Sequence, residues 1–104
     1  MDILYRYQIK NKKVFISEHR CLKYESKNLI KVEGMGYITM SSLNVLRQNN
    51  TMISFDQTLT KKFLSYLLDK KTHHMKKLTE DLEKLYEEVK LITNLREEYN
   101  ETKQ

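Results

Sequence analysis

Proline and tryptophan are absent from this 104-residue chain, and cysteine and glycine are scarce. Because Cys21 is the single cysteine, one chain can form neither an intramolecular disulfide nor a cysteine-based zinc site. Gly34 and Gly36 are the only glycines, and their spacing indicates a bend or bulge rather than a Gly-rich phosphate loop. These shortages exclude an intramolecular disulfide, a cysteine-based zinc site within one chain and a Gly-rich phosphate loop.

Long apolar runs are missing as well. No segment approaches the roughly 18 consecutive apolar residues of a membrane span, and the first residues lack the basic and apolar regions of a signal peptide. Apolar residues still make up 39% of the chain, which is enough for a modest globular core. We expect a single domain, residues 1–104, in the reducing cytoplasm and without a cofactor.

Charge is distributed unevenly along the chain. Residues 1–77 contain 15 Lys and Arg against 6 Asp and Glu, a net charge of +9, whereas residues 78–104 contain 4 against 8, a net charge of −4. The first part is therefore expected to attract anions and the second to repel them.

Residues 3–10 alternate between two kinds of side chain, which is typical of a strand with one buried face. The residues predicted to face the core are Ile3, Tyr5, Tyr7 and Ile9, and those predicted to face solvent are Leu4, Arg6, Gln8 and Lys10. The turn-like "NKK" at 11–13 and the β-branched "VFISE" at 14–18 complete a predicted hairpin.

A second hairpin is predicted from "RCLKYE" at 20–25 and "LIKVEG" at 29–34. In the register that we favour, Leu22 and Tyr24 face the same side as Ile30 and Val32. These hairpins predict an antiparallel sheet in the first part of the chain.

The rest of the β-rich region, residues 1–56, has weaker signals. Residues 34–40 and 51–55 are expected to be short strands, with one or two helical turns around Leu43 to Arg47 between them. Asp56 or Thr58 is expected to cap the long helical region that follows.

Two apolar stripes lie in the helical region, residues 57–98. The first consists of Leu59, Phe63, Tyr66 and Leu67. The second consists of Met75, Leu78, Leu82, Leu85, Val89 and Ile92, whose spacings of three and four are typical of a coiled coil. We expect a homo-oligomer that assembles through Leu78, Leu82, Leu85, Val89 and Ile92.

The stripes differ in phase across "LDKKTHHMKK" at 68–77, so the helical region is either one long helix or a helical hairpin. Because no glycine or proline lies there, we favour a continuous or only kinked helix. Residues 99–104 are expected to be a frayed tail. The predicted fold class is α+β, an N-terminal antiparallel sheet followed by this helical region.

The sequence predicts no catalytic and no metal site. His73 and His74 are adjacent, so on a helix their side chains point about 100° apart and cannot grip one metal as a pair spaced by four can. Cys21 and His19 point to the same side of a strand but lack an orienting group, and no acids form a catalytic pair. We therefore expect a protein that is not an enzyme.

Basic and aromatic residues suggest a binding function instead. Arginine forks and aromatic faces are the groups that recognise phosphates and bases. The candidate ligand-binding residues are Arg6, Arg20, Arg47, Lys61, Lys62, Tyr5, Tyr7 and Phe55, and Tyr24 and Tyr37 are further possible stacking surfaces. The alternative is that the lysines only keep the surface solvated and the tyrosines fill a sheet face.

The β-rich front, the Ser-Ser-Leu turn at 41–43, the "SFDQT" entry at 54–58 and the Lys/Glu-rich helical end resemble small accessory proteins of phages that infect low-GC Gram-positive bacteria. This resemblance implies an anti-defence role in the host cytoplasm. Some oligomeric members of that group, the phage sponges that sequester cyclic nucleotide signals, are similar in combining small sheets with helices that interlock between subunits. It carries no ligand residues onto this chain.

The leading hypothesis is therefore a non-enzymatic oligomer that sequesters a phosphate-bearing nucleotide signal. One alternative is a protein that inhibits a host defence enzyme, as an anti-CRISPR does. Another is a small nucleic-acid-binding regulator, whose binding would depend strongly on salt.

Overall fold

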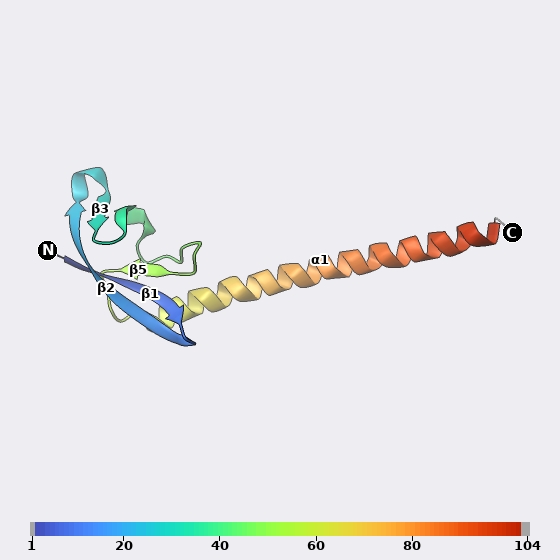
Figure 1. Ribbon diagram of the computed structural model, residues 1–104, viewed down its shortest axis with the longest axis horizontal. Helices are drawn as coiled ribbons and strands as arrows, with labels where there is room; N and C mark the ends of the chain where they lie inside the picture. Colours follow the sequence, from blue (N-terminus) through green and yellow to red (C-terminus); the bar gives the residue numbers. More distant parts are fainter. Residues whose placement is uncertain (1, 103–104) are drawn as a thin grey trace. The chain divides into compact units, whose positions relative to one another are not determined.

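The computed structural model describes residues 2–102 and confirms the predicted α+β class, with an antiparallel sheet followed by one long helix (Figure 1). The strands are β1 (Asp2–Lys10), β2 (Lys13–Tyr24), β3 (Leu29–Val32), β4 (Gly36–Thr39) and β5 (Met52–Ser54). They form one sheet in the order β4-β3-β2-β1-β5. The helix is α1 (Thr60–Thr102), and short 3₁₀ turns lie at Glu25–Lys27 and Met40–Ser42.

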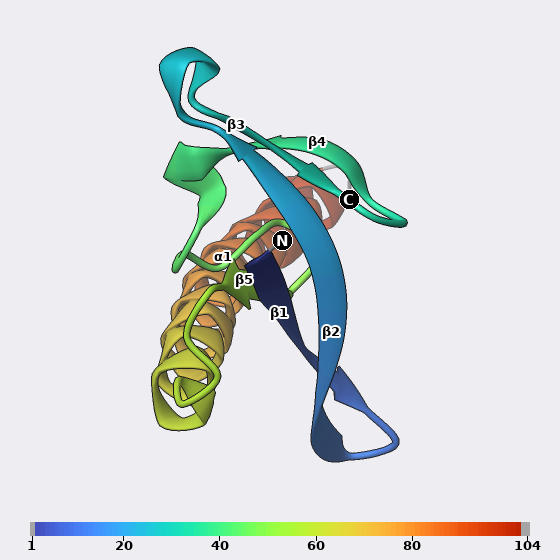
Figure 2. The same ribbon diagram turned by 90° about the vertical axis from the view of Figure 1, so that its left-hand side faces the viewer.

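The predicted first hairpin is present. Lys10 pairs with Lys13, and the two residues between them, Asn11 and Lys12, have φ angles of 53° and 64°. Two consecutive positive φ angles are typical of the type I′ turn that matches the twist of a hairpin. The two segments predicted as strands of separate hairpins are one 12-residue strand, β2, which curves between β1 and β3 (Figure 2).

One face of the sheet carries the first core. Its buried side chains come from all five strands and are Leu4, Cys21, Ile30, Val32, Ile38 and Ile53. Met35, Met40, Leu43 and Phe55 pack against them from the connecting segments. The segments that follow β3, β4 and β5 therefore cover part of this face.

The other face carries the second core, made of Tyr7, Met52 and Phe63, at the β1 and β5 side of the sheet. Phe63 comes from the first turns of α1, and its ring centroid lies 5.8 Å from that of Tyr7. The remaining first-stripe residues of α1, Leu59, Tyr66 and Leu67, pack here as well. This intrachain packing explains the first apolar stripe.

The predicted alternation in β1 is wrong because both faces of this strand are covered. Leu4 is fully buried in the first core and Tyr7 in the second, whereas Ile9 is 49% exposed near the hairpin end. A strand with a core on each side does not separate into an apolar face and a polar face.

The segment between β4 and β5 is not the predicted helical turn around Leu43 to Arg47. Its backbone instead follows β5, because the Asn44 N–H donates to the Ile53 carbonyl at 2.8 Å and the Arg47 N–H donates to the Thr51 carbonyl at 2.8 Å. These bonds occupy backbone groups beside β5 that would otherwise form an open edge.

A buried tyrosine positions the start of α1. The Tyr7 hydroxyl donates to the Asp56 carbonyl at 2.5 Å and accepts a bond from the Leu59 N–H at 3.1 Å. The Asp56 carboxylate accepts bonds from the Thr58 N–H and hydroxyl at 2.7 and 2.6 Å, so it orders the turn before the helix. Neither Asp56 nor Thr58 is the cap, since the Leu59 carbonyl accepts the first helical bond, from Phe63.

Helix α1 is continuous through His73 and His74, which confirms the continuous alternative and excludes the hairpin. The helix extends to Thr102, so residues 99–102 are helical rather than a frayed tail, and residues 103–104 lie outside the described residues. The chain divides into two compact units inside this helix. The sheet unit ends at Leu68, and the helical unit begins at Asp69.

Candidate binding face of the sheet

Strands β3 and β4 and the second half of β2 have one buried and one exposed side. Directly paired residues of antiparallel strands project to the same side, and Leu22 pairs with Lys31, which pairs with Tyr37. We define the open face as the exposed part of this side, which consists of Arg20, Leu22, Tyr24, Lys31 and Tyr37. All five side chains are exposed. Tyr37 has a larger exposed fraction, 61%, than Leu22 or Tyr24.

The register of β2 and β3 corrects the sequence prediction. Ile30 pairs with Lys23, and Val32 pairs with Cys21, so Leu22 and Tyr24 face away from Ile30 and Val32. Because side chains alternate along a strand, this one-residue difference moves Leu22 and Tyr24 from the core to the surface. The open face is a consequence of that register.

Two tyrosines meet on the open face. The ring centroids of Tyr24 and Tyr37 lie 6.4 Å apart with an interplanar angle of 43°. The ammonium of Lys31 lies 5.8 Å from the Tyr37 centroid, within the range of a cation–π contact. The arrangement presents aromatic surface beside positive charge.

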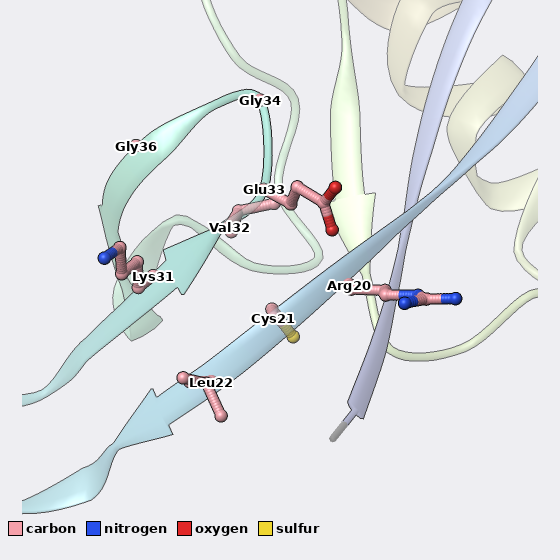
Figure 3. Close-up of a pocket in the computed structure, with 8 residues that line it drawn as sticks. All are labelled: Arg20, Cys21, Leu22, Lys31, Val32, Glu33, Gly34 and Gly36. Atoms are coloured by element: carbon pink, nitrogen blue, oxygen red, sulfur yellow. The ribbon is translucent and has the colours of Figure 1, made fainter.

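A shallow cavity of about 390 Å³ adjoins the open face at the β3–β4 turn (Figure 3). Its lining includes Arg20, Lys31 and Glu33, and Figure 3 shows the Arg20 and Lys31 side chains pointing away from one another. The turn itself requires glycine for backbone reasons alone: Gly34 and Gly36 have φ angles of 81° and 78°, yet an added Cβ would meet nothing within 4 Å.

The charge of the sheet unit favours anionic ligands. Residues 1–68 contain 11 Lys and Arg against 5 Asp and Glu, a net charge of +6. Residues 69–104 contain 8 against 9, a net charge of −1. The attraction for anions is therefore concentrated in the unit that has the open face.

Only Arg20 among the predicted ligand residues lies on the open face. Arg6 projects to the opposite side of the sheet, where its Nε atom is buried without a hydrogen-bond partner among the described residues. Tyr5 is half-buried and packs against the second core. Tyr7 is 0% exposed, so its prediction as a stacking surface is wrong: the ring is enclosed by the core that holds α1 in place.

The other predicted ligand residues are dispersed. Arg47 lines a separate hollow with Gln48 and Asn49. Phe55 packs against the first core, and the Lys23 ammonium lies 4.3 Å from its ring centroid. Lys61 and Lys62 are exposed in the first turn of α1, where Lys62 lies 5.8 Å from the ring centroid of Tyr66. Together with Arg6 and Tyr7, these residues do not form one site within the chain.

The cysteine and histidines show no reactive arrangement in the described part of the chain. Burial, with a smaller contribution from Asp2, raises the pKa of the Cys21 thiol, which disfavours the reactive thiolate. His19 hydrogen-bonds through Nε2 to the Ser17 hydroxyl at 2.8 Å. Between residues 2 and 102, no three His, Cys, Asp or Glu side chains are grouped as a metal site requires.

The residues that sequence reasoning missed are Leu22 and Lys31. Tyr24 and Tyr37 were named as possible stacking surfaces, but nothing in the sequence paired them. Side chains alternate between the two sides of the strand in both "CLKY" and "IKV". Which of the two sides is exposed becomes clear only from the pairing of Cys21 with Val32.

Comparisons with protein-family models, curated protein sequences and solved structures gave no match. Within residues 2–102, α1 is not apolar enough to cross a membrane. The resemblance to phage accessory proteins thus stays a prediction, and the case for function depends on the geometry of the chain itself.

Proposed function

We propose that this protein is a non-catalytic binding protein whose open face takes up single-stranded nucleic acid. The observation that carries the proposal is the exposed contact between Tyr24 and Tyr37 on an uncovered sheet face beside Lys31. Aromatic side chains on a sheet stack with bases of any sequence, and nearby cations contact the phosphates. Lys31, beside Tyr37, and Arg20 are the cations of the open face.

The geometry of the open face suits a strand better than a single small nucleotide. The tyrosines lie on exposed rows of the sheet, and the adjoining cavity is shallow and also lined by the carboxylate-bearing Glu33. A small phosphate-bearing ligand is usually enclosed by convergent polar groups. Sequestration of a nucleotide signal stays a prediction, as do the phage origin and the cytoplasmic location.

The test is fluorescence anisotropy with labelled oligothymidylate and oligouridylate of about 12 nucleotides, the length range that such surfaces cover. Replacing Tyr37 with Ala should weaken binding about 5- to 150-fold, because one stacked base contributes about 1–3 kcal/mol. Tyr86→Ala is the matched control: Tyr86 is 72% exposed but lies on the helical unit. Equal losses in the two variants would refute the assignment to the open face.

Salt dependence distinguishes the remaining ligands. Replacing Arg20 with Gln should reduce the slope of log affinity against log salt concentration by about 0.7, the value for one phosphate contact on a single strand. Tight, salt-tolerant binding of one cyclic or mononucleotide, without oligonucleotide binding, would instead favour sequestration. If neither ligand binds, the proposal is wrong, and inhibition of a host defence enzyme is the alternative hypothesis to test next.

A further inference from the structure

The helical unit presents an apolar series that no described residue of the chain covers. Its six members have exposed fractions between 54% and 68% and are Met75, Leu78, Leu82, Leu85, Val89 and Ile92. We define these residues as the seam. Spacings of three and four place them at alternating a and d positions of a heptad repeat, with Met75 at a and Leu78 at d.

We propose that the seam packs against the same seam of a second copy in a parallel, in-register coiled coil. An identical partner is self-complementary, because each a and d side chain inserts between four side chains of the facing helix. Charged residues limit the apolar series at both ends: Lys71 stands one heptad step before Met75, and Arg96 stands one step after Ile92. Long charged side chains at these ends can reach water.

The residues at the e and g positions, beside the seam, favour a parallel orientation of the two helices. The g positions that precede Met75, Leu82 and Val89 are His74, Asp81 and Glu88, and the e positions that follow Leu78, Leu85 and Ile92 are Thr79, Tyr86 and Thr93. In a parallel pair, each g residue faces an e residue of the partner, so the two acids meet Tyr86 and Thr93.

An antiparallel pair has a different set of neighbours. The register that matches all six seam residues places Leu82 opposite Leu85 and Met75 opposite Ile92. Its g residues then face one another, so Asp81 lies against Glu88 twice in each dimer. Like charges at facing positions repel, whereas in the parallel arrangement neither Asp81 nor Glu88 faces another acid.

The oligomeric state tests the seam. In sedimentation equilibrium at micromolar concentrations, the full chain should have twice the 12.6 kDa mass of one copy. Replacing both Leu82 and Leu85 with Glu should halve that mass. Leu91→Glu is the matched control, because Leu91 is 58% exposed on the same helix but lies outside the a and d positions. A monomeric wild type, or equal dissociation by Leu91→Glu, would overturn the proposal.

Cross-linking tests the orientation. On mild oxidation, the Leu78→Cys variant should form a disulfide-linked dimer, whereas the wild type, whose Cys21 is buried, and Leu91→Cys should not. In the antiparallel register, residue 78 lies opposite residue 89 of the partner. The two copies of residue 78 are then eleven residues, or about 16 Å, apart along the helix axis. This is beyond the Cα separation of about 7 Å that a disulfide allows. Cross-linking only in a mixture of Leu78→Cys and Val89→Cys would overturn the parallel orientation.

Discussion

The sheet unit buries the apolar stripe of its part of α1, whereas the helical unit leaves the apolar stripe of its part exposed. Phe63 is fully buried in the second core, while Leu82, further along the same helix, is 64% exposed. Both residues belong to regular apolar stripes. The comparison teaches that periodicity shows that one side of a helix is apolar, but does not show whether the covering surface comes from the same chain.

The largest expected effect comes from removing a side chain that joins α1 to the sheet. Phe63→Ala should lower the free energy of unfolding of the sheet unit by about 3–5 kcal/mol, because it leaves a cavity beside Tyr7 and Met52. Leu82→Ala should leave that unit nearly unchanged. Urea denaturation followed by tyrosine fluorescence measures both, and similar losses would mean that the two units are not energetically distinct.

A smaller loss is expected when only one hydroxyl is removed. Tyr7→Phe deletes the bonds to the Asp56 carbonyl and the Leu59 N–H, and should cost about 1–3 kcal/mol because buried backbone groups lose their partner. Tyr37→Phe, on the exposed open face, should be close to neutral. The same urea experiment compares the two variants, and a neutral Tyr7→Phe would show that these bonds do not position α1.

Cys21 reports on the first core alone. The residue is 2% exposed, and burial raises the pKa of its thiol, so its reaction with an aromatic disulfide reagent should be at least about tenfold slower in the folded chain than in urea. The reaction rate should rise only under conditions that open the sheet. Equal rates in the folded and unfolded chain would indicate that the first core opens readily.

The smallest expected effect is on the stability of the protein at low pH. Hydrogen bonds from the Thr58 hydroxyl and N–H lower the pKa of the Asp56 carboxyl. A lowered folded-state pKa contributes stability above the ordinary pKa, and this contribution is lost as the pH falls through the lowered value. Asp56→Asn retains an acceptor oxygen but does not titrate, so its melting temperature should fall less steeply below pH 4. Identical acid profiles would contradict this role.

Much of the fold could be predicted because its signals are local. The "NKK" turn, the short strand at Met52–Ser54 and the continuous helix through His73 and His74 follow from turn chemistry, β-branched residues and the lack of a helix breaker. The prediction of helical turns near Leu43 failed because hydrogen bonds to β5 outweigh the local preference.

The candidate site was harder to predict than the fold. The sequence drew attention to Arg20 and to the tyrosines, but it grouped Arg20 with Arg6, which lies on the other side of the sheet. Tyr7 looked like its neighbour Tyr5, yet Tyr7 is fully buried because Phe63 covers it. Which side of a strand is covered depends on residues far away in the chain, and no local pattern records it.

The sequence by itself determined the type of each long element and the seam of the helical unit, because strand and helix periods are properties of neighbouring residues. Only the tertiary structure decided which side of each element is buried. The pairing of Cys21 with Val32 exposes Leu22 and Tyr24, and the contact of Phe63 with Tyr7 assigns the first stripe of α1 to the sheet. Both outcomes depend on long-range register, in which a shift of one residue exchanges the buried and exposed sides of a strand.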